Sequence, residues 1–187
     1  QGSKGAYKVE SLEQLKGYLT GDGSQIVTEF LPGEEYTIDC FTDRAGQVRY
    51  AEGRLRQRIM NGISVRSIRA SNKQFSEVAE KINEALRFRG AWFIQLKKSE
   101  AGELVLMEVA PRIAGTMALS RAYGVNLPLL SLFDALDMPV AISENNYDIT
   151  IDRALANSFD LRLDYGHVYI DFDDVMLSGN IINTPVR

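Results

Sequence analysis

The chain has 187 residues, 45% of them hydrophobic and 25% charged, with a formal net charge of −4, a composition that excludes disordered and collagen-like proteins and argues against generic nucleic-acid binding. A single cysteine excludes an internal disulfide, and one cysteine with one histidine provides no cluster for a structural zinc site. The single cysteine favours a reducing, cytoplasmic setting. No apolar run approaches the ~18 residues of a membrane span, so we expect no membrane association.

The first predicted elements are a glycine-rich turn at residues 2–5, a short strand at 6–9 and a helix at 11–19. Ser11 and Gln14 have the spacing of a capping box, and leucines recur behind them at helical intervals. A strand is expected at 25–30, followed by a break at 31–33. Residues 35–42 and 47–51 are expected to form a β-hairpin around the turn at 43–46.

The second half of the chain alternates helices and strands. The clearest helix is predicted at 75–88, where apolar residues lie on one stripe. Strands at 91–97 and 103–109 follow, joined by a turn, and then an apolar helical stretch at 117–123 and a helix at 126–137 that Pro139 stops. The tail from residue 147 contains short strands, and 143–146 is the best candidate for a domain boundary.

Seven of the fourteen arginines lie between residues 44 and 69. Because a guanidinium binds carboxylate and phosphate through two parallel hydrogen bonds, this cluster predicts an anion site. Two alternatives stay open. One is a pair of exposed strands with charged outer faces, and the other is an RNA-binding surface, which would bind single strands with a steep salt dependence.

Pairing of the two strands between residues 91 and 109 brings Gln95 and Glu108 approximately opposite one another. Opposite side chains on one face of a sheet have Cβ atoms about 5 Å apart, so these two oxygen donors could share a Mg²⁺ ion. Glu108 follows an apolar run, where a carboxylate gains little without a cation. The alternative is a carboxylate that points into solvent or pairs with Arg112.

A glycine-rich loop opens the chain and could wrap phosphate with its backbone N–H groups while its lysine adds a positive charge. The alternative is an ordinary flexible end. The residues of this loop are Gly2, Ser3, Lys4 and Gly5.

Four segments in this order, residues 2–5, 27–39, Gln95 and 107–112, resemble the ATP-grasp superfamily, in the branch of carbamoyl-phosphate synthase large subunits. The resemblance covers about residues 1–140 and implies an α+β fold with an antiparallel sheet and flanking helices. It implies the end of a lid subdomain at 1–24, a core subdomain at 25–142 and a connecting segment at 143–165. Because the chain does not begin with Met, we expect a fragment of a larger protein.

The resemblance also implies roles for individual residues. The mobile loop over the ATP phosphates would consist of Gly2, Ser3, Lys4 and Gly5. The segment that reads the adenine and holds the ribose would consist of Glu29, Phe30, Leu31 and Glu35. Gln95 and Glu108 match the pair that binds Mg²⁺, with Mn²⁺ as a substitute. Arg112 matches the arginine that meets the transferred phosphate, and Arg54 and Arg56 begin the stretch expected to bind the acid substrate.

One departure affects the implied function. The family pattern ends in Glu-x-Asn-Pro-Arg, whereas this chain has Ala110 in place of the asparagine. The resemblance implies a ligase that phosphorylates a carboxylate with ATP and then transfers the acyl group to an amine or thiol. Because Ala110 supplies no metal ligand, the alternative is a nucleotide-binding or regulatory module with weak or no turnover.

The C-terminal tail carries a second resemblance. Residues 168–175 form an apolar run that ends in alternate aspartates, similar to the first motif of haloacid-dehalogenase-type phosphohydrolases. That likeness implies that Asp171 attacks phosphate and binds Mg²⁺ while Asp173 acts as general acid and base. Residues 166–187 would then be the first strand of a further domain, and this piece alone would have no phosphatase activity.

The expected partners are therefore ATP and a small carboxylic or amino acid, without nucleic acid or membrane, and a homodimer is compatible with the resemblance. Neither Cys40 nor His167 has an evident catalytic partner in the sequence, so both are expected to be structural.

Overall fold

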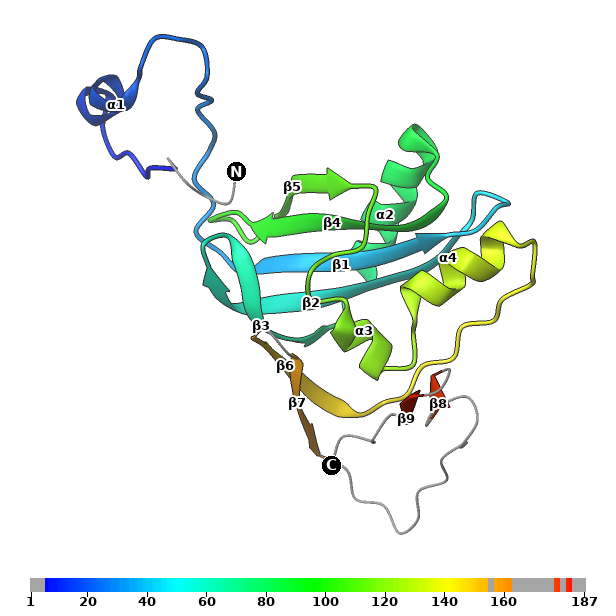
Figure 1. Ribbon diagram of the computed structural model, residues 1–187. Coiled ribbons are helices and arrows are strands. Elements are labelled where there is room, and N and C mark those ends of the chain that lie inside the picture. The colour runs from blue at the N-terminus through cyan, green and yellow to red at the C-terminus, as the bar shows by residue number, and fades with distance from the viewer. Residues whose placement is uncertain (1–5, 155–156, 163–176, 179–180, 183–187) are drawn as a thin grey trace.

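The computed structural model describes residues 6–154, 157–162, 177–178 and 181–182. Its centre is a seven-stranded sheet in the order β5-β4-β1-β2-β3-β6-β7 (Figure 1), in which every neighbouring pair is antiparallel. The strands are β1 (Glu35–Thr42), β2 (Val48–Met60), β3 (Ile63–Ala70), β4 (Gly90–Lys98), β5 (Leu104–Ala110), β6 (Asp148–Arg153) and β7 (Asn157–Arg162). A separate two-stranded sheet pairs β8 (Leu177–Ser178) with β9 (Ile181–Ile182).

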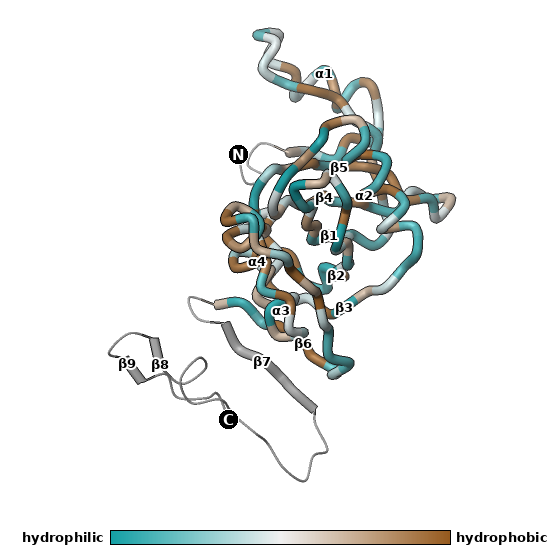
Figure 2. Tube along the Cα trace, turned by 90° about the vertical axis from the view of Figure 1, so that its right-hand side faces the viewer, coloured by the Kyte–Doolittle hydropathy of each residue, from teal (hydrophilic) through white to brown (hydrophobic). Residues whose placement is uncertain are grey.

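Helices cover both faces of the large sheet (Figures 1 and 2). One face carries α2 (Lys73–Leu86), and the other carries α3 (Ala118–Ala122) and α4 (Leu127–Ala135). The central strand β1 is buried over nearly its whole length because both faces are covered. None of the described helices is both long enough and apolar enough to cross a membrane.

The core under α2 is apolar. Alternate residues of β1, Tyr36, Ile38 and Cys40, pack with Phe75 and other residues of α2. Gly53 on β2 lies directly beneath the Phe75 ring, where a Cβ atom would collide with the ring and with backbone. The small residue therefore allows α2 to approach the sheet closely. Burial raises the pKa of the Cys40 thiol well above its ordinary value, which agrees with a structural role.

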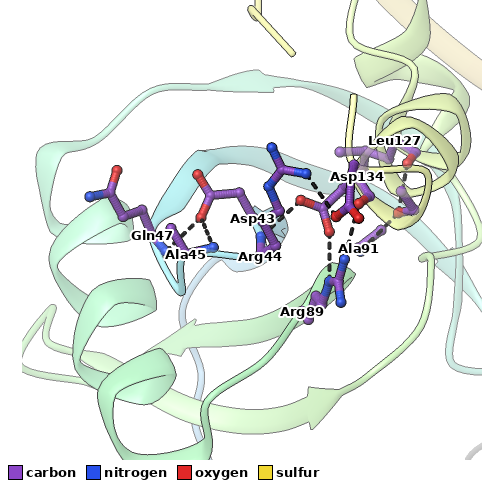
Figure 3. A network of polar contacts seen from close by, with 10 residues as sticks. Asp43, Arg44, Ala45, Gln47, Arg89, Ala91, Leu127 and Asp134 are labelled. Carbon is purple, nitrogen blue, oxygen red and sulfur yellow. Dashed lines mark hydrogen bonds and ion pairs between the residues drawn. The ribbon is translucent and has the colours of Figure 1, made fainter. Parts of the chain in front are cut away.

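A second apolar cluster lies on the sheet face that carries α4, where Phe41 and Tyr50 pack against that helix. The carboxylate of Asp134 connects three elements at this end of the sheet (Figure 3). Asp134 of α4 accepts hydrogen bonds from the Arg44 N–H at 2.8 Å and from Arg89 Nε at 2.7 Å. These contacts tie α4 to the β1–β2 turn and to the start of β4.

The structure confirms most of the predicted elements. The helix expected at 11–19 is α1 (Leu12–Tyr18), capped by Ser11, whose Oγ accepts a hydrogen bond from the Gln14 N–H. Gln14 reaches back to the N–H of Glu10 rather than to that of Ser11. The helices and strands predicted between residues 75 and 137 correspond to α2, β4, β5, α3 and α4.

The strands predicted at 6–9 and 25–30 were wrong, since neither segment is a strand. Ile26 and Val27 are exposed, and the described chain offers neither segment a neighbouring strand for hydrogen bonding. Together with α1 these residues project from the sheet (Figures 1 and 2). Within them Tyr7 stacks on Tyr18, with ring centroids 4.3 Å apart.

The sheet also extends further than expected. β2 runs on to Met60 and turns at Asn61 and Gly62, both with positive φ, into β3. The arginine-rich stretch therefore forms a pair of strands. Its charged residues are not confined to an exposed face, because Arg54 and Arg56 are buried. β6 and β7 confirm the short strands predicted from residue 147, and they join the large sheet although residues 143–165 were expected to be a connection.

Candidate functional site

A cavity of about 300 Å³ opens on the sheet face that carries α3. Three arginines line it, and among the described residues no carboxylate does. The full lining is Thr37, Arg56, Gly62, Ile63, Ser64, Phe93, Gln95, Arg112, Ala114, Gly115, Thr116 and Arg153. A concave site with positive charge and a partly apolar wall is suited to a small anion.

The strand registers explain why polar side chains of different strands lie together at this cavity. Thr37 of β1 lies opposite Arg54 of β2 and opposite Gln95 of β4, and Gln95 lies opposite Glu108 of β5. Opposite residues project to the same face, so one row of polar side chains crosses the sheet beside α3. The predicted juxtaposition of Gln95 and Glu108 is thus confirmed.

Arg56 forms the floor of the cavity with a side chain only 4% exposed. Its guanidinium donates to the Glu35 carboxylate, to Gln95 Oε1 at 3.0 Å and to the Gly62 carbonyl at 2.6 Å. The Arg56 Nε is buried without a hydrogen-bond partner among the described residues. Burial lowers the pKa of Arg56, an effect that the charge of Glu35 opposes. The Arg56 residue nevertheless lines the cavity, so its positive charge lies beside any anion bound there.

Arg54 is also buried, yet it does not line the cavity. It forms a two-pronged ion pair with Asp39 at 2.7 and 2.9 Å, and it donates to Thr116 Oγ1. Ser120 of α3 donates to the same Asp39 carboxylate at 2.8 Å. These contacts fasten α3, and the loop that precedes it, to the sheet. The structure therefore separates Arg54 from the other predicted substrate residue, Arg56.

Arg112 lines the cavity, and Glu108 lies beside Arg112 outside the lining. The Glu108 carboxylate is 45% exposed and lies 3.8 Å from the Arg112 guanidinium. Arg112 stacks over the Phe93 ring, with the guanidinium carbon 4.9 Å from the ring centroid. The pair anticipated between Glu108 and Arg112 is present, although its distance and exposure make it weak.

The other clustered arginines bind carboxylates elsewhere on the molecule, so the cluster in the sequence is not one basic patch. Arg58 and Arg66 both pair with Asp152, at 3.2 and 2.7 Å. Arg69 pairs with Glu52 and Glu144. Arg44 and Arg49 pair with Asp137 and Asp43.

Of the residues predicted to hold the nucleoside, Glu35 lines a cavity beside Arg56, whereas Glu29, Phe30 and Leu31 do not line it. Glu35 contacts Arg56 and lies 3.7 Å from Lys97. Leu31 is buried, whereas Phe30 is exposed and lies under the Lys8 ammonium at 4.7 Å. Glu29 is exposed. A second cavity, of about 410 Å³, includes Glu35 and shares Arg56 with the first.

Several predicted residues lie outside the described part of the chain. These are the glycine-rich loop Gly2, Ser3, Lys4 and Gly5, the histidine His167, and the aspartates Asp171 and Asp173.

Residues that the sequence analysis missed complete the cavity. Arg153 at the end of β6 enters it from the strand beyond β3, and Gly115 and Thr116 form its rim. Arg153 follows Ile149 and Ile151 at intervals of two, and both isoleucines are buried against α3. That alternation predicts that Arg153 faces the same side of the sheet, a signal available in the sequence once β6 is recognised as part of it.

Residues 22–155, most of the chain, match the family described as "ATP-grasp in the biosynthetic pathway with Ter operon". The chain belongs to this ATP-grasp family. No match was found among curated proteins.

Solved structures of the ATP-grasp fold are similar. The phosphoribosylaminoimidazole carboxylase ATPase subunit from Aquifex aeolicus is 19% identical with a TM-score of 0.60, over 67% of this chain and 42% of that one. A biotin carboxylase from Campylobacter jejuni, titled as a β,γ-ATP complex, is 13% identical with a TM-score of 0.59, over 67% and 31%. N5-carboxyaminoimidazole synthetase from Staphylococcus aureus with ADP is 14% identical with a TM-score of 0.58, over 67% and 35%. This chain thus spans less than half of each, and the likeness shows the fold.

The donor set beside the cavity fits one Mg²⁺ ion. Gln95 and Glu108 lie opposite one another and carry side-chain oxygens of the kind that Mg²⁺ prefers, although Gln95 Oε1 also accepts a hydrogen bond from Arg56. Ala110, on the same face of β5 as Glu108, packs against Phe93 and Ala114 and offers no oxygen. No group of three or more His, Cys, Asp or Glu side chains within the described ranges is arranged to hold a metal.

Proposed function

We propose that the protein to which this chain belongs is an ATP-dependent ligase, which activates a small carboxylic or amino acid as an acyl-phosphate and transfers the acyl group to an amine or thiol. The observation that carries this proposal is the arginine-lined cavity beside the Gln95–Glu108 pair. Membership of an ATP-grasp family supports the use of ATP.

The chain's own residues supply positioning and charge. Arg56 is held by three acceptors, and its positive charge would stabilise an incoming carboxylate or acyl-phosphate in the cavity that it lines. Arg112, which also lines the cavity, would neutralise charge on the phosphoryl group in transit. The apolar wall that includes Phe93 would hold the acid against Arg56 and limit the access of water, which would otherwise hydrolyse an acyl-phosphate.

Gln95 and Glu108 would hold Mg²⁺, for which Mn²⁺ could substitute. When bound, the ion supplies a charge that neutralises the β- and γ-phosphates of ATP. We assign Gly2, Ser3, Lys4 and Gly5 to a loop over those phosphates, and Glu29, Phe30, Leu31 and Glu35 to the nucleoside. The shared position of Arg56 between the two cavities supports nucleotide and acid sites that adjoin one another.

A second candidate function is a nucleotide-binding module with weak or no turnover. Ala110 favours it, because this residue is buried among apolar neighbours where a further metal ligand would stand. In that case the cavity would sense an anion rather than activate it.

Release of ADP and phosphate from MgATP by the complete protein, measured with a panel of small carboxylic and amino acids, separates the two candidates. The ligase requires release that depends on one of the acids and rises further with an amine or thiol acceptor. Tight MgATP binding with no acid-dependent release would support the second candidate and overturn the first.

We further propose the narrower identities that the resemblance implied. These are a carbamoyl-phosphate-synthase-like ligase, a homodimeric state, and a phosphohydrolase-like domain that begins at 166 with Asp171 and Asp173. Mg²⁺-dependent hydrolysis of p-nitrophenyl phosphate by the complete protein, lost in Asp171→Asn, tests the last of these.

A further inference from the structure

Arg153 occupies a distinctive place in the cavity. It is the last residue of β6, where Ile149 and Ile151 precede it on the face buried against α3. Arg153 lines the cavity that Arg56 lines from β2, beside Gly115 in the loop that precedes α3. The two guanidiniums therefore reach one small cavity from strands on either side of β3.

The neighbouring carboxylate is not placed to neutralise Arg153. Asp152 projects to the opposite face of β6, because successive residues of a strand alternate. It is already bound to Arg58 and Arg66 there. Among the residues that the structure describes, Arg153 forms no ion pair of its own. Its charge is therefore available to a ligand in the cavity.

Gly115 makes room for the Arg153 side chain. A Cβ atom at position 115 would meet the Arg153 guanidinium, with Nη1 the closest atom. The obstructing atoms belong to the end of a flexible side chain, and no backbone lies close. An alanine would therefore displace the guanidinium at little cost to the fold.

In the proposed ligase, Arg56 binds the reacting carboxylate and Arg112 neutralises the phosphoryl group that is transferred to it. Neither role requires Arg153. We propose that Arg153 binds a second carboxylate of the substrate, so that this site selects small dicarboxylates over monocarboxylates. This inference rests on the proposed function for the identity of the reacting carboxylate. A cavity of about 300 Å³ restricts such a substrate to a short chain.

Matched pairs of acids test the inference, because an amide replaces one carboxylate at nearly constant shape. The pairs are succinate with succinamate, L-aspartate with L-asparagine and L-glutamate with L-glutamine. Binding to the complete protein is measured by calorimetry with Mg²⁺ and a non-hydrolysable ATP analogue, and phosphate release from MgATP is measured separately. Arg153→Gln and Gly115→Ala are compared with Arg49→Gln, which changes an exposed arginine on β2 outside the cavity.

For at least one pair, the wild-type protein is expected to bind the dicarboxylate about 10- to 100-fold more tightly, as for a charged hydrogen-bonded pair. Arg153→Gln abolishes that preference, and Gly115→Ala weakens it. Gly115→Ala adds little in the Arg153→Gln background, because both act on one contact. Arg49→Gln retains the full preference.

The outcomes distinguish this inference from the proposed function. Preferential dicarboxylate binding that requires Arg153, without phosphate release, supports the inference and overturns the ligase. Acid-dependent release in which dicarboxylates and their amides are equivalent, or in which Arg153→Gln changes nothing, overturns the inference and supports the ligase. Failure of every acid to bind overturns the inference, and an unchanged thermal unfolding midpoint verifies that each variant is folded.

Discussion

Arg54 and Arg56 lie two residues apart on the same face of β2, and both are buried, yet their surroundings differ. Arg54 is enclosed by Asp39 and Thr116 and has no contact with the cavity. Arg56 contacts Glu35 and Gln95 and lines the cavity, and its buried Nε has no hydrogen-bond partner in the part of the chain that the structure describes. A buried arginine enclosed by its partners away from a cavity has a structural role, whereas a buried arginine that also lines a cavity can bind an anion there.

The largest expected effect is on stability at the Arg54 network. Arg54→Ala leaves Asp39 buried without its ion-pair partner, so we expect the free energy of unfolding to fall by about 3–5 kcal/mol. Urea unfolding measures it, with Arg49→Ala as the exposed control. A loss below about 1 kcal/mol would remove the distinction between the two arginines.

At Arg56 the expected effect moves from stability to activity. Arg56→Gln should lower acid-dependent phosphate release by about 10²–10³-fold, as for other preorganised donors to a reacting anion. The free energy of unfolding should fall by only about 1–2 kcal/mol, because Lys97 stays near Glu35. If Arg56→Gln instead matched Arg54→Ala in stability and left release unchanged, both residues would be structural.

Glu108 extends the comparison to the proposed metal ligands. Glu108→Gln keeps the shape but removes the negative charge, so the Mg²⁺ concentration for half-maximal release should rise by about 10- to 100-fold. A titration of release against Mg²⁺ at saturating ATP measures this. Glu103→Gln, in the exposed β4–β5 turn, is the control, and an unaltered Mg²⁺ requirement in Glu108→Gln would contradict the assignment.

The smallest effect is expected at Asp134, which lies at the end of the sheet away from the proposed site (Figure 3) and contributes to stability rather than to activity. Burial acts to raise the pKa of Asp134, but the hydrogen bonds from Arg89 and Arg44 prevail and hold it below its ordinary value. A carboxyl whose pKa is lowered in the folded state stabilises the protein above its unfolded pKa, near 3.9, and loses that contribution as the pH falls through the folded pKa.

Asp134→Asn should therefore cost roughly 1.5 kcal/mol at pH 7, with the difference from wild type shrinking below about pH 4. Urea unfolding between pH 3 and pH 7 measures the trend, and phosphate release at pH 7 should be unchanged. A difference that grew towards low pH would contradict the sign of the pKa shift.

Local patterns predicted much of the fold. Helical periodicity and Ser11 predicted α1, and the turn between β4 and β5 predicted the pairing of Gln95 with Glu108, because both signals depend on residues close in the sequence. The strand expected at 25–30 shows the opposite case. Its residues have high strand propensity, but a strand needs a hydrogen-bonded neighbour that propensity does not supply.

The candidate site was predicted only in part for a similar reason. Arg56, Gln95 and Arg112 were identified from the sequence and line one cavity. Arg153 was missed because β6 joins the sheet beside β3, more than 80 residues earlier in the chain, and no local signal predicts that pairing. The separation of Arg54 from Arg56 also depends on such distant contacts, with Thr116 and Ser120 of the α3 region.

The most direct test of the central claim is acid-dependent release of phosphate from MgATP by the complete protein, compared between wild type, Arg56→Gln and Arg49→Gln. We predict that at least one small acid stimulates release in wild type, that Arg56→Gln loses this stimulation, and that Arg49→Gln retains it. Stimulation that survives in Arg56→Gln at the wild-type level, in a protein that binds MgATP normally, would contradict the assignment of this cavity to the acid substrate.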